Sequence, residues 1–177
     1  MSKPSPRPLV LIGYRATGKT TVGRLLAARL GWGFSDVDEY IESVFGGSIA
    51  DIFVAEGEPG FRNRESTALS VLCNQNRCVI ATGGGAILRP ENRSLLRSAG
   101  FVIWLTANPE TIWARIQLDP TTAARRPSLT AAGGLEEVRA LLAAREPLYR
   151  ETADFVANAN VPSPEDIASA ILTQWTG

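Results

Sequence analysis

Four residues near the amino terminus have types and a spacing that are typical of phosphate binding. Gly13 is followed, after four intervening positions, by the consecutive residues Gly18, Lys19 and Thr20. Glycines allow successive backbone N–H groups to turn inward, which makes a concave anion site at the amino end of a helix. In such a loop the lysine contacts the β- and γ-phosphates and the hydroxyl ligates Mg²⁺. The pattern predicts a site for a nucleoside triphosphate and Mg²⁺; an ordinary glycine-rich turn is the weaker alternative.

Two carboxylates, Asp36 and Asp38, end the short strand that is expected to start at residues 34–35. If the extended conformation continues to residue 38, alternation along the strand places both carboxylates on one side. Asp36 is then a candidate to orient a magnesium-bound water, and Asp38 a candidate to accept a hydrogen bond from an acceptor hydroxyl. The alternatives are structural, because Asp36 could cap a turn and Asp38 could be the N-cap of the helix that runs through Ile41.

Three consecutive glycines at 83–85 and a few arginines are further candidates. The glycines follow an apolar run and let the backbone approach a small ligand closely, unless they form only a tight turn. Arg62 and Arg145 could hold an anionic substrate, although a single arginine is most often a solvated surface charge. Arg125 and Arg126 lie in a stretch without apolar periodicity, from which they could bring positive charge onto transferring phosphates.

The elements that would position these residues alternate between strands and helices. Continuous apolar runs, typical of strands buried on both faces, precede segments of helical periodicity. The pattern predicts an α/β fold with a parallel sheet covered by helices on both faces. Ligands bind beyond the carboxyl ends of such strands, so the phosphate loop, the two carboxylates and the glycines should meet at one edge. The expected strands are at residues 9–12, 34–38, 78–81, 101–105 and 155–157.

Residues 118–134 have no apolar periodicity and contain several prolines and glycines beside Arg125 and Arg126. A loop of this length in a compact domain is usually a functional lid or a disordered link. A lid over the phosphates excludes water, which a phosphoryl-transfer enzyme needs in order to suppress hydrolysis. We therefore expect a lid at about 118–134. Helices are expected to begin near residues 19, 41, 48, 90, 109, 135 and 164, and residues 48–51 fit a capping box at the third of these starts. An interruption is expected at 57–60, before a further helix from residue 61.

The composition narrows the classes of function. The chain has 177 residues, with 18 basic and 18 acidic side chains, so bulk attraction to nucleic acid or anionic membranes is not indicated. The absence of histidine excludes His-dependent zinc sites and Ser-His-Asp hydrolysis. No apolar run approaches the length of a membrane span. We expect one domain over residues 1–177, a cytoplasmic monomer with small-molecule substrates, and inert thiols at Cys73 and Cys78.

Taken together, these residues resemble the shikimate kinase family, a relative of the nucleoside monophosphate kinases. The resemblance extends from residue 9 to about residue 172. It implies a three-layer P-loop kinase fold with a five-stranded parallel sheet, a substrate-binding region at about 38–62 and a lid. The blocks that carry it are the phosphate loop at 13–20, Asp36-x-Asp38, Gly47 to Phe53, Gly57-Glu58 with Phe61-Arg62, Gly83 to Gly85, Arg126-Pro127 and Arg145-x-Pro147-Leu-Tyr149.

The resemblance implies transfer of the γ-phosphate of ATP to the 3-hydroxyl of shikimate, giving shikimate 3-phosphate for aromatic amino-acid synthesis. Asp38 would hold the ring hydroxyls and orient the acceptor, while Arg62 and Arg145 would grip the carboxylate. The implied catalytic residues are Lys19, Asp38 and Arg126. The implied nucleotide contacts are Gly13, Ala16, Thr17, Gly18, Lys19, Thr20, Thr21, Arg115, Arg126 and Pro162, with Thr20 and Asp36 at Mg²⁺. The implied shikimate contacts are Asp38, Arg62, Gly83, Gly84, Gly85 and Arg145.

Two residues of the phosphate loop depart from the family pattern. Ala16 stands where the family commonly has glycine, and we expect a negative φ there because alanine disfavours the left-handed region. Arg15 adds a charge near the phosphates or the lid.

Two other functions are compatible with parts of the sequence. The nearer one is another small-molecule kinase of the same fold, such as a gluconate or nucleoside monophosphate kinase. Arg62 and Arg145 together with Asp38 favour a compact hydroxylated acid over these acceptors. The other is a nucleotide-binding regulator that has lost catalysis. Such a regulator would lack a metal ligand, an acceptor-holding carboxylate or a lid arginine, and the chain has all three.

Overall fold

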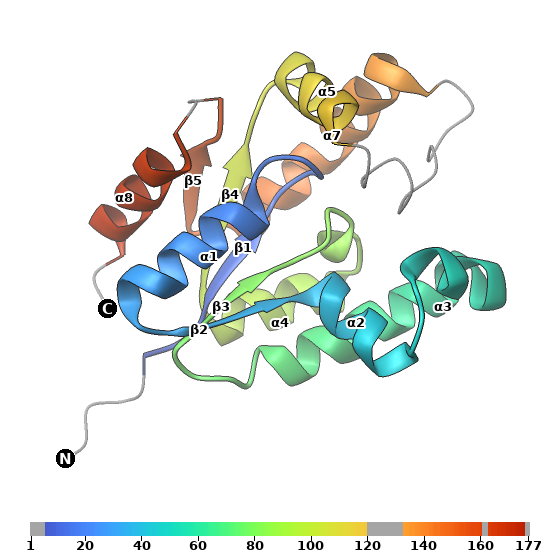
Figure 1. Cartoon of the computed structure of the whole chain (residues 1–177), viewed down its shortest axis with the longest axis horizontal. Helices are drawn as coiled ribbons and strands as arrows, with labels where there is room; N and C mark the ends of the chain where they lie inside the picture. The colour runs from blue at the N-terminus through green and yellow to red at the C-terminus, as the bar shows by residue number, and fades with distance from the viewer. Residues whose placement is uncertain (1–5, 120–132, 161–162, 176–177) are drawn as a thin grey trace.

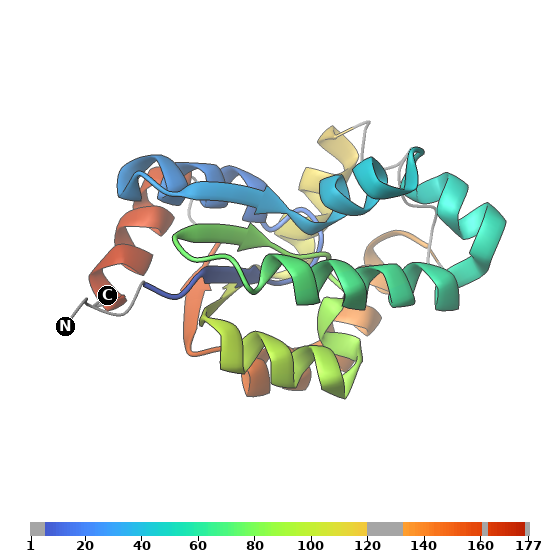
Figure 2. The ribbon, with the colours of Figure 1, turned by 90° about the horizontal axis from the view of Figure 1, so that it is seen from below.

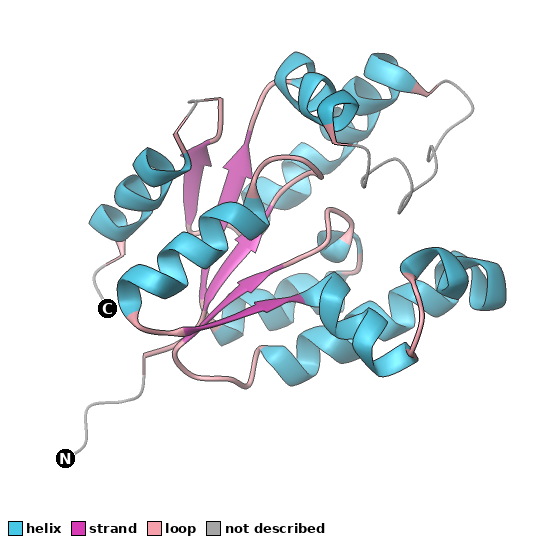
Figure 3. Ribbon diagram, viewed as in Figure 1, coloured by secondary structure: helices cyan, strands magenta, loops and turns pink. Residues whose placement is uncertain are grey.

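Within the described residues, 6–119, 133–160 and 163–175, five parallel strands form one sheet in the computed structural model (Figure 1, Figure 3). The strands are β1 (Leu9–Ile12), β2 (Gly33–Asp36), β3 (Cys78–Ala81), β4 (Phe101–Thr106) and β5 (Phe155–Asn158). Their order across the sheet is β2-β3-β1-β4-β5, and each neighbouring pair is parallel. The parallel sheet and the α/β class expected from the sequence are confirmed.

Helices cover both faces of the sheet (Figure 2). The helices are α1 (Lys19–Leu30), α2 (Val37–Phe45), α3 (Ile49–Leu72), α4 (Pro90–Ala99), α5 (Pro109–Leu118), α7 (Gly134–Thr152) and α8 (Pro164–Gln174), with a short 3₁₀ turn η1 at Ala86–Leu88. α1 and α8 pack together on one face, whereas α3 and α4 lie on the other. This arrangement is the three-layer fold that the sequence predicted.

The central strand β1 shows why the sequence has an uninterrupted apolar run here. Leu9 and Leu11 face the core formed with α1 and α8. Val10 and Ile12 face the core formed with α3 and α4. All four side chains are fully buried, so neither face of the strand tolerates a polar residue, and the β1 end at Ile12 is held firmly beneath the phosphate loop.

The chain after β2 differs from the expectation of a longer strand. β2 ends at Asp36, and α2 begins at Val37, so Asp36 and Asp38 do not alternate along one strand. The Asp36 side chain accepts hydrogen bonds from the backbone N–H groups of Asp38 and Glu39, at 2.9 and 3.3 Å. Asp36 is therefore the N-cap of α2, and the alternative N-cap role considered for Asp38 is also wrong.

The long helix α3 begins at the predicted capping box and bends at a glycine. The Ser48 hydroxyl accepts a hydrogen bond from the Asp51 N–H, and the Asp51 carboxylate accepts one from the Ser48 N–H. Gly57, with φ of 67° and ψ of −174°, breaks the helical geometry where the sequence predicted an interruption. In the part of the chain that the structure describes, neither α3 nor any other helix is long and apolar enough to cross a membrane.

The two cysteines lie at the junction of α3 and β3. Both are buried and neither forms a disulfide. Burial raises the pKa of the Cys73 thiol to about 11, and the neighbouring Cys78 contributes to the increase. The thiol of Cys73 is therefore protonated at neutral pH, which agrees with the expectation of an unreactive side chain.

Candidate active site

The residues between β1 and α1 form a loop around an inward-facing lysine. Gly13 and Gly18 have φ values of 141° and 92°, which glycine adopts readily. A Cβ atom on Gly13 would collide with the carbonyl oxygen of Leu105, so β4 packs directly against the loop. The Lys19 ammonium donates hydrogen bonds of 2.8 Å to the carbonyl oxygens of Gly13 and Tyr14. The loop thus holds a buried cation at the amino end of α1, as an anion site requires.

The backbone at Ala16 is left-handed, and the expectation of a negative φ is wrong. Its φ is 61°, a conformation that costs an alanine roughly 1–2 kcal/mol. Arg115 Nη1 donates a hydrogen bond of 3.5 Å to the Ala16 carbonyl oxygen, and Nη2 donates one of 2.7 Å to the carbonyl oxygen of Ala159. Arg115 ties the loop to the chain after β5, so a tertiary contact helps to hold the conformation that alanine alone disfavours.

Thr20 and Asp36, the two candidate metal ligands, lie in contact. The Thr20 hydroxyl donates a hydrogen bond of 2.9 Å to Asp36 Oδ2, while Asp36 Oδ1 caps α2. Capping therefore fixes the carboxylate and leaves its second oxygen directed at the first turn of α1. Asp38 follows in the first turn of α2.

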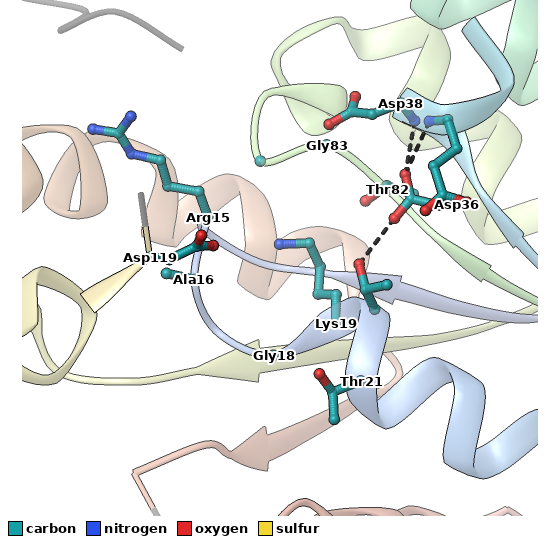
Figure 4. A pocket seen from close by; sticks show the side chains of 13 residues that line it. Arg15, Ala16, Gly18, Lys19, Thr21, Asp36, Asp38, Thr82, Gly83 and Asp119 are labelled. Carbon is teal, nitrogen blue, oxygen red and sulfur yellow. Dashed lines mark hydrogen bonds between the residues drawn. The ribbon is translucent and has the colours of Figure 1, made fainter. Parts of the chain in front are cut away.

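A cavity of about 280 Å³ opens at the carboxyl edge of the sheet, where these segments meet (Figure 4). The phosphate loop, the start of α2 and the turn after β3 all contribute to its wall, so the three motifs converge as the strand ends predicted. Thr82, Glu39 and Asp119 also line it, and the sequence had not marked them. The lining residues are Arg15, Ala16, Gly18, Lys19, Thr20, Thr21, Asp36, Asp38, Glu39, Thr82, Gly83, Gly84 and Asp119.

The glycine turn after β3 is packed on two sides. A Cβ atom on Gly84 would lie 3.3 Å from the Arg15 backbone nitrogen, so this glycine lies close against the phosphate loop. A Cβ atom on Gly85 would lie 2.5 Å from both terminal nitrogens of Arg62. The turn therefore needs small residues, because it is wedged between the loop that forms the phosphate site and a guanidinium group from α3.

Arg62 is held by acidic residues of its own helix. Its Nη1 donates a hydrogen bond of 2.7 Å to Glu65 Oε2, and its Nη2 lies 3.4 Å from Glu58 Oε1. Glu65 is fully buried, and the sequence analysis had missed it. The spacing of three residues from Arg62 is the signal that could have found it, because residues at i and i+3 are neighbours on a helix.

Arg145 lies on the other side of the turn and is held differently. Arg145 is only 8% exposed. Its Nη1 donates a hydrogen bond of 3.4 Å to the Gly84 carbonyl oxygen. The Tyr149 hydroxyl donates a shorter bond of 2.5 Å to the same oxygen. Within the described residues, Arg145 forms no ion pair with a carboxylate. Neither Arg145 nor Arg62 lines the cavity itself; each contacts the turn that forms part of its wall.

Part of the expected site falls outside the described residues. Arg126 and Pro162 lie there, as does most of the expected lid, residues 120–132. The helix that precedes the lid region ends at Leu118, and Asp119 lines the cavity. The helix that follows, α7, begins at Gly134 and carries Arg145.

The comparisons with known proteins agree with this geometry. The family model described as shikimate kinase matches residues 15–176. The chain belongs to the shikimate kinase family. A shikimate kinase of Symbiobacterium thermophilum is 46% identical over 164 residues, which covers 93% of each chain. A shikimate kinase of Rhodopirellula baltica is 43% identical over 167 residues, covering 94% of this chain and 89% of the relative.

A solved shikimate kinase also shares the whole fold. The structure of the Acinetobacter baumannii shikimate kinase in complex with shikimate has a TM-score of 0.88 and 39% identity, covering 95% of this chain and 92% of that one. The resemblance to the shikimate kinase family noted from the motifs is confirmed. Membership of this family favours shikimate as the acceptor over gluconate or a nucleoside monophosphate.

Proposed function

We infer that this chain is a shikimate kinase, which transfers the γ-phosphoryl group of ATP to shikimate, and we propose the 3-hydroxyl as the acceptor. The observation that carries the inference is the buried guanidinium of Arg145, which has no carboxylate partner among the described residues. A buried charge is costly unless it is paired. A small substrate carboxylate at the glycine turn would supply the missing partner beside the phosphate cavity.

The phosphate loop would hold the nucleotide. Lys19, now donating to two backbone carbonyls, can turn its ammonium toward the β- and γ-phosphates. Residues 18–21 line the cavity, and the backbone N–H groups at the start of α1 would bind the phosphates there. We propose that Arg115 lies against the adenine, with the chain near Pro162 completing that pocket. Arg115 donates hydrogen bonds to the carbonyl oxygens of Ala16 and Ala159, so it already connects the phosphate loop to the chain after β5.

The residues at the start of α1 and α2 fit Mg²⁺. Within the described residues there is no cluster of three or more acidic, histidine or cysteine side chains. Mg²⁺ bound to a nucleotide needs few protein ligands, because phosphates and waters supply most of its oxygens. The Thr20 hydroxyl would be a direct ligand and Asp36 would orient a metal-bound water. When bound, Mg²⁺ neutralises charge on the β- and γ-phosphates.

The acceptor side would be built from Asp38, Arg62 and Arg145. The two guanidinium groups would bind the carboxylate from either side of the glycine turn, while Asp38 accepts a hydrogen bond from the reacting hydroxyl. The hydroxyl oxygen forms a bond to the γ-phosphorus as the bond to the β-phosphate oxygen breaks, and the hydroxyl proton passes to Asp38. An ordinary aspartate suffices because the transition state is loose and positioning dominates. Arg126 would contribute positive charge from the lid.

A coupled assay of ADP release with Mg-ATP and a panel of acceptors tests this function. Shikimate should accelerate ADP release far above the rate without acceptor, whereas gluconate and AMP should not. The phosphorylated product should carry its phosphate at the 3-position by ³¹P and ¹H NMR. Acceleration by gluconate or AMP, with none by shikimate, would replace the proposal with one of the alternative kinases.

We propose a role in aromatic amino-acid synthesis, a monomeric cytoplasmic enzyme formed by a single domain, and ATP and shikimate as its partners. The zero formal net charge supports the absence of a nucleic-acid or membrane partner.

A further inference from the structure

The side chain of Tyr14 is buried close to two arginines, although its backbone belongs to the phosphate loop. Tyr14 is 1% exposed. The Cζ atom of Arg145 lies 5.6 Å from the centroid of its ring, and Cζ of Arg15 lies 5.9 Å from it. Both distances are within the range of cation–π attraction. We call Tyr14, Arg15, Glu137 and Arg145 the Tyr14 cluster.

The position of the Arg145 guanidinium depends on few contacts. Its one hydrogen bond within the described residues is the long one to the Gly84 carbonyl oxygen. The Tyr149 hydroxyl donates a hydrogen bond to the same oxygen. A guanidinium is a rigid plane with five N–H donors. An aromatic face can restrain that plane without using any of the donors, so the Tyr14 ring holds the group and leaves its donors available to a carboxylate.

Arg15 and Glu137 form an ion pair within the Tyr14 cluster. Arg15 Nη2 lies 3.4 Å from Glu137 Oε1, and the Glu137 side chain is 1% exposed. The Arg15 side chain extends away from Lys19 in Figure 4. Glu137 and Arg145 belong to the same helix, about two turns apart. Because Arg15 neutralises Glu137, the cluster retains the positive charge of Arg145.

We propose that Tyr14 is a positioning residue for the acid acceptor: its ring holds the Arg145 guanidinium beside Gly84, where the substrate carboxylate binds. The proposal rests on the proposed function and assigns to the phosphate loop a part in acceptor recognition. The face of the ring, rather than the hydroxyl, holds the guanidinium in place. The hydroxyl is buried and has no hydrogen-bond partner of good geometry among the described residues. Burial also raises the pKa of Tyr14, so the phenol is neutral at physiological pH.

The test replaces Tyr14 by Phe and then by phenylalanines carrying one to five fluorines, which weaken the negative face of the ring while keeping its shape. Tyr14→Phe should keep the KM of the wild type for shikimate. Along the fluorinated series the KM for shikimate should rise stepwise, by roughly 3- to 30-fold in total, while the KM for ATP stays constant. Tyr14→Leu, which removes the ring, should raise the KM for shikimate by about as much as the most fluorinated ring.

Phe34 provides a matched control, because its ring lies 4.9 Å from Cζ of Arg24, an exposed arginine. Pentafluorophenylalanine at position 34 should leave both KM values unchanged. A KM for shikimate that stays flat along the position-14 series, or a KM for ATP that rises in parallel, overturns the role of Tyr14. Failure of the wild-type enzyme to phosphorylate shikimate would instead overturn the proposed function, so the two failures are distinguishable.

Discussion

Asp36 and Asp38 are two residues apart, yet their surroundings differ. One oxygen of Asp36 caps α2 and the other accepts the Thr20 hydroxyl, so this carboxylate is fixed against the phosphate site. Asp38 is in the first turn of α2 and lines the cavity. The cap thus creates the difference in surroundings, since it turns the chain from a strand into a helix between the two acids.

The substitution Asp38→Asn tests the acceptor role. The amide keeps the size of the side chain but removes the negative charge that orients and receives the hydroxyl proton. Turnover should fall by about 100-fold or more, while the KM for ATP changes little. Asp166→Asn is a control for the loss of an acidic residue in the first turn of a helix, here α8. Wild-type turnover of the Asp38→Asn enzyme would remove Asp38 from the reaction.

The substitution Arg62→Lys tests the guanidinium fork on α3. Lysine keeps the charge but cannot donate two parallel hydrogen bonds to a carboxylate. Loss of a charged hydrogen bond of about 1.5–3 kcal/mol corresponds to a KM for shikimate raised by about 10- to 100-fold, with the KM for ATP unchanged. Arg64→Lys, which alters a partly exposed arginine paired with Glu56, is the matched control. An unaltered KM for shikimate in Arg62→Lys would exclude Arg62 from the acid site.

At the scale of elements, the glycine turn between β3 and η1 sets the distance between the phosphate loop and α3. The substitution Gly85→Ala tests this spacing. The backbone there has φ of −101°, which alanine accepts, so the effect is steric. The new Cβ atom would displace the Arg62 guanidinium, which Glu65 restrains.

Gly85→Ala should therefore raise the KM for shikimate and change thermal stability little, because the colliding atoms are the end of a flexible side chain. Gly33→Ala in β2 is the control, since a Cβ atom there meets only ordinary contacts near 3.9 Å. Both can be followed by steady-state kinetics and thermal melts. A Gly85→Ala enzyme that kept the KM of the wild type would show that the Arg62 position does not matter for the acceptor.

The phosphate loop carries a measurable strain at Ala16. The substitution Ala16→Gly should stabilise the fold by up to about 1 kcal/mol, because glycine accepts the positive φ without the steric cost. Ala27→Gly, in the regular part of α1, should have the opposite sign and destabilise by about 1 kcal/mol. Urea denaturation measures both. Destabilisation by Ala16→Gly equal to that of Ala27→Gly would contradict a strained loop.

The elements differ in how well the sequence predicted them. β1 and β4 were predicted because their apolar runs are buried on both faces. The kink at Gly57 and the cap at Ser48 were predicted because glycine and the capping box act locally. The predicted start of α2 was too late in the chain, because Asp36 was considered only as the cap of a turn and not as the N-cap of a helix.

Two of the features that the sequence did not predict depend on contacts between elements. The φ of Ala16 depends on the local chain and on Arg115, which lies ninety-nine positions later. The place of Tyr14 beside Arg145 depends on the packing of α7 against the loop. Spacing along the chain contains no information on such neighbours, whereas the strand ends that gather the motifs at one edge follow from the parallel topology alone.

At the scale of the whole molecule, the sheet edge brings the phosphate loop and the proposed acid site together. The phosphate loop is continuous with β1, and the glycine turn is continuous with β3, its direct neighbour in the sheet. α3 and α7 then present Arg62 and Arg145 to the two sides of that turn. The order of the strands therefore decides that an acid bound at the turn lies beside the phosphates.

The most direct measurement compares kcat/KM for shikimate with kcat/KM for its methyl ester, which keeps the hydroxyls but has no negative charge. The wild-type enzyme should prefer the acid by about 10- to 100-fold, as expected for loss of a charged hydrogen bond. In Arg145→Met this preference should fall severalfold, because only the Arg62 guanidinium would then remain to pair with the acid. An ester that reacts as fast as the acid with the wild-type enzyme, or a preference that is unchanged in Arg145→Met, would contradict the account.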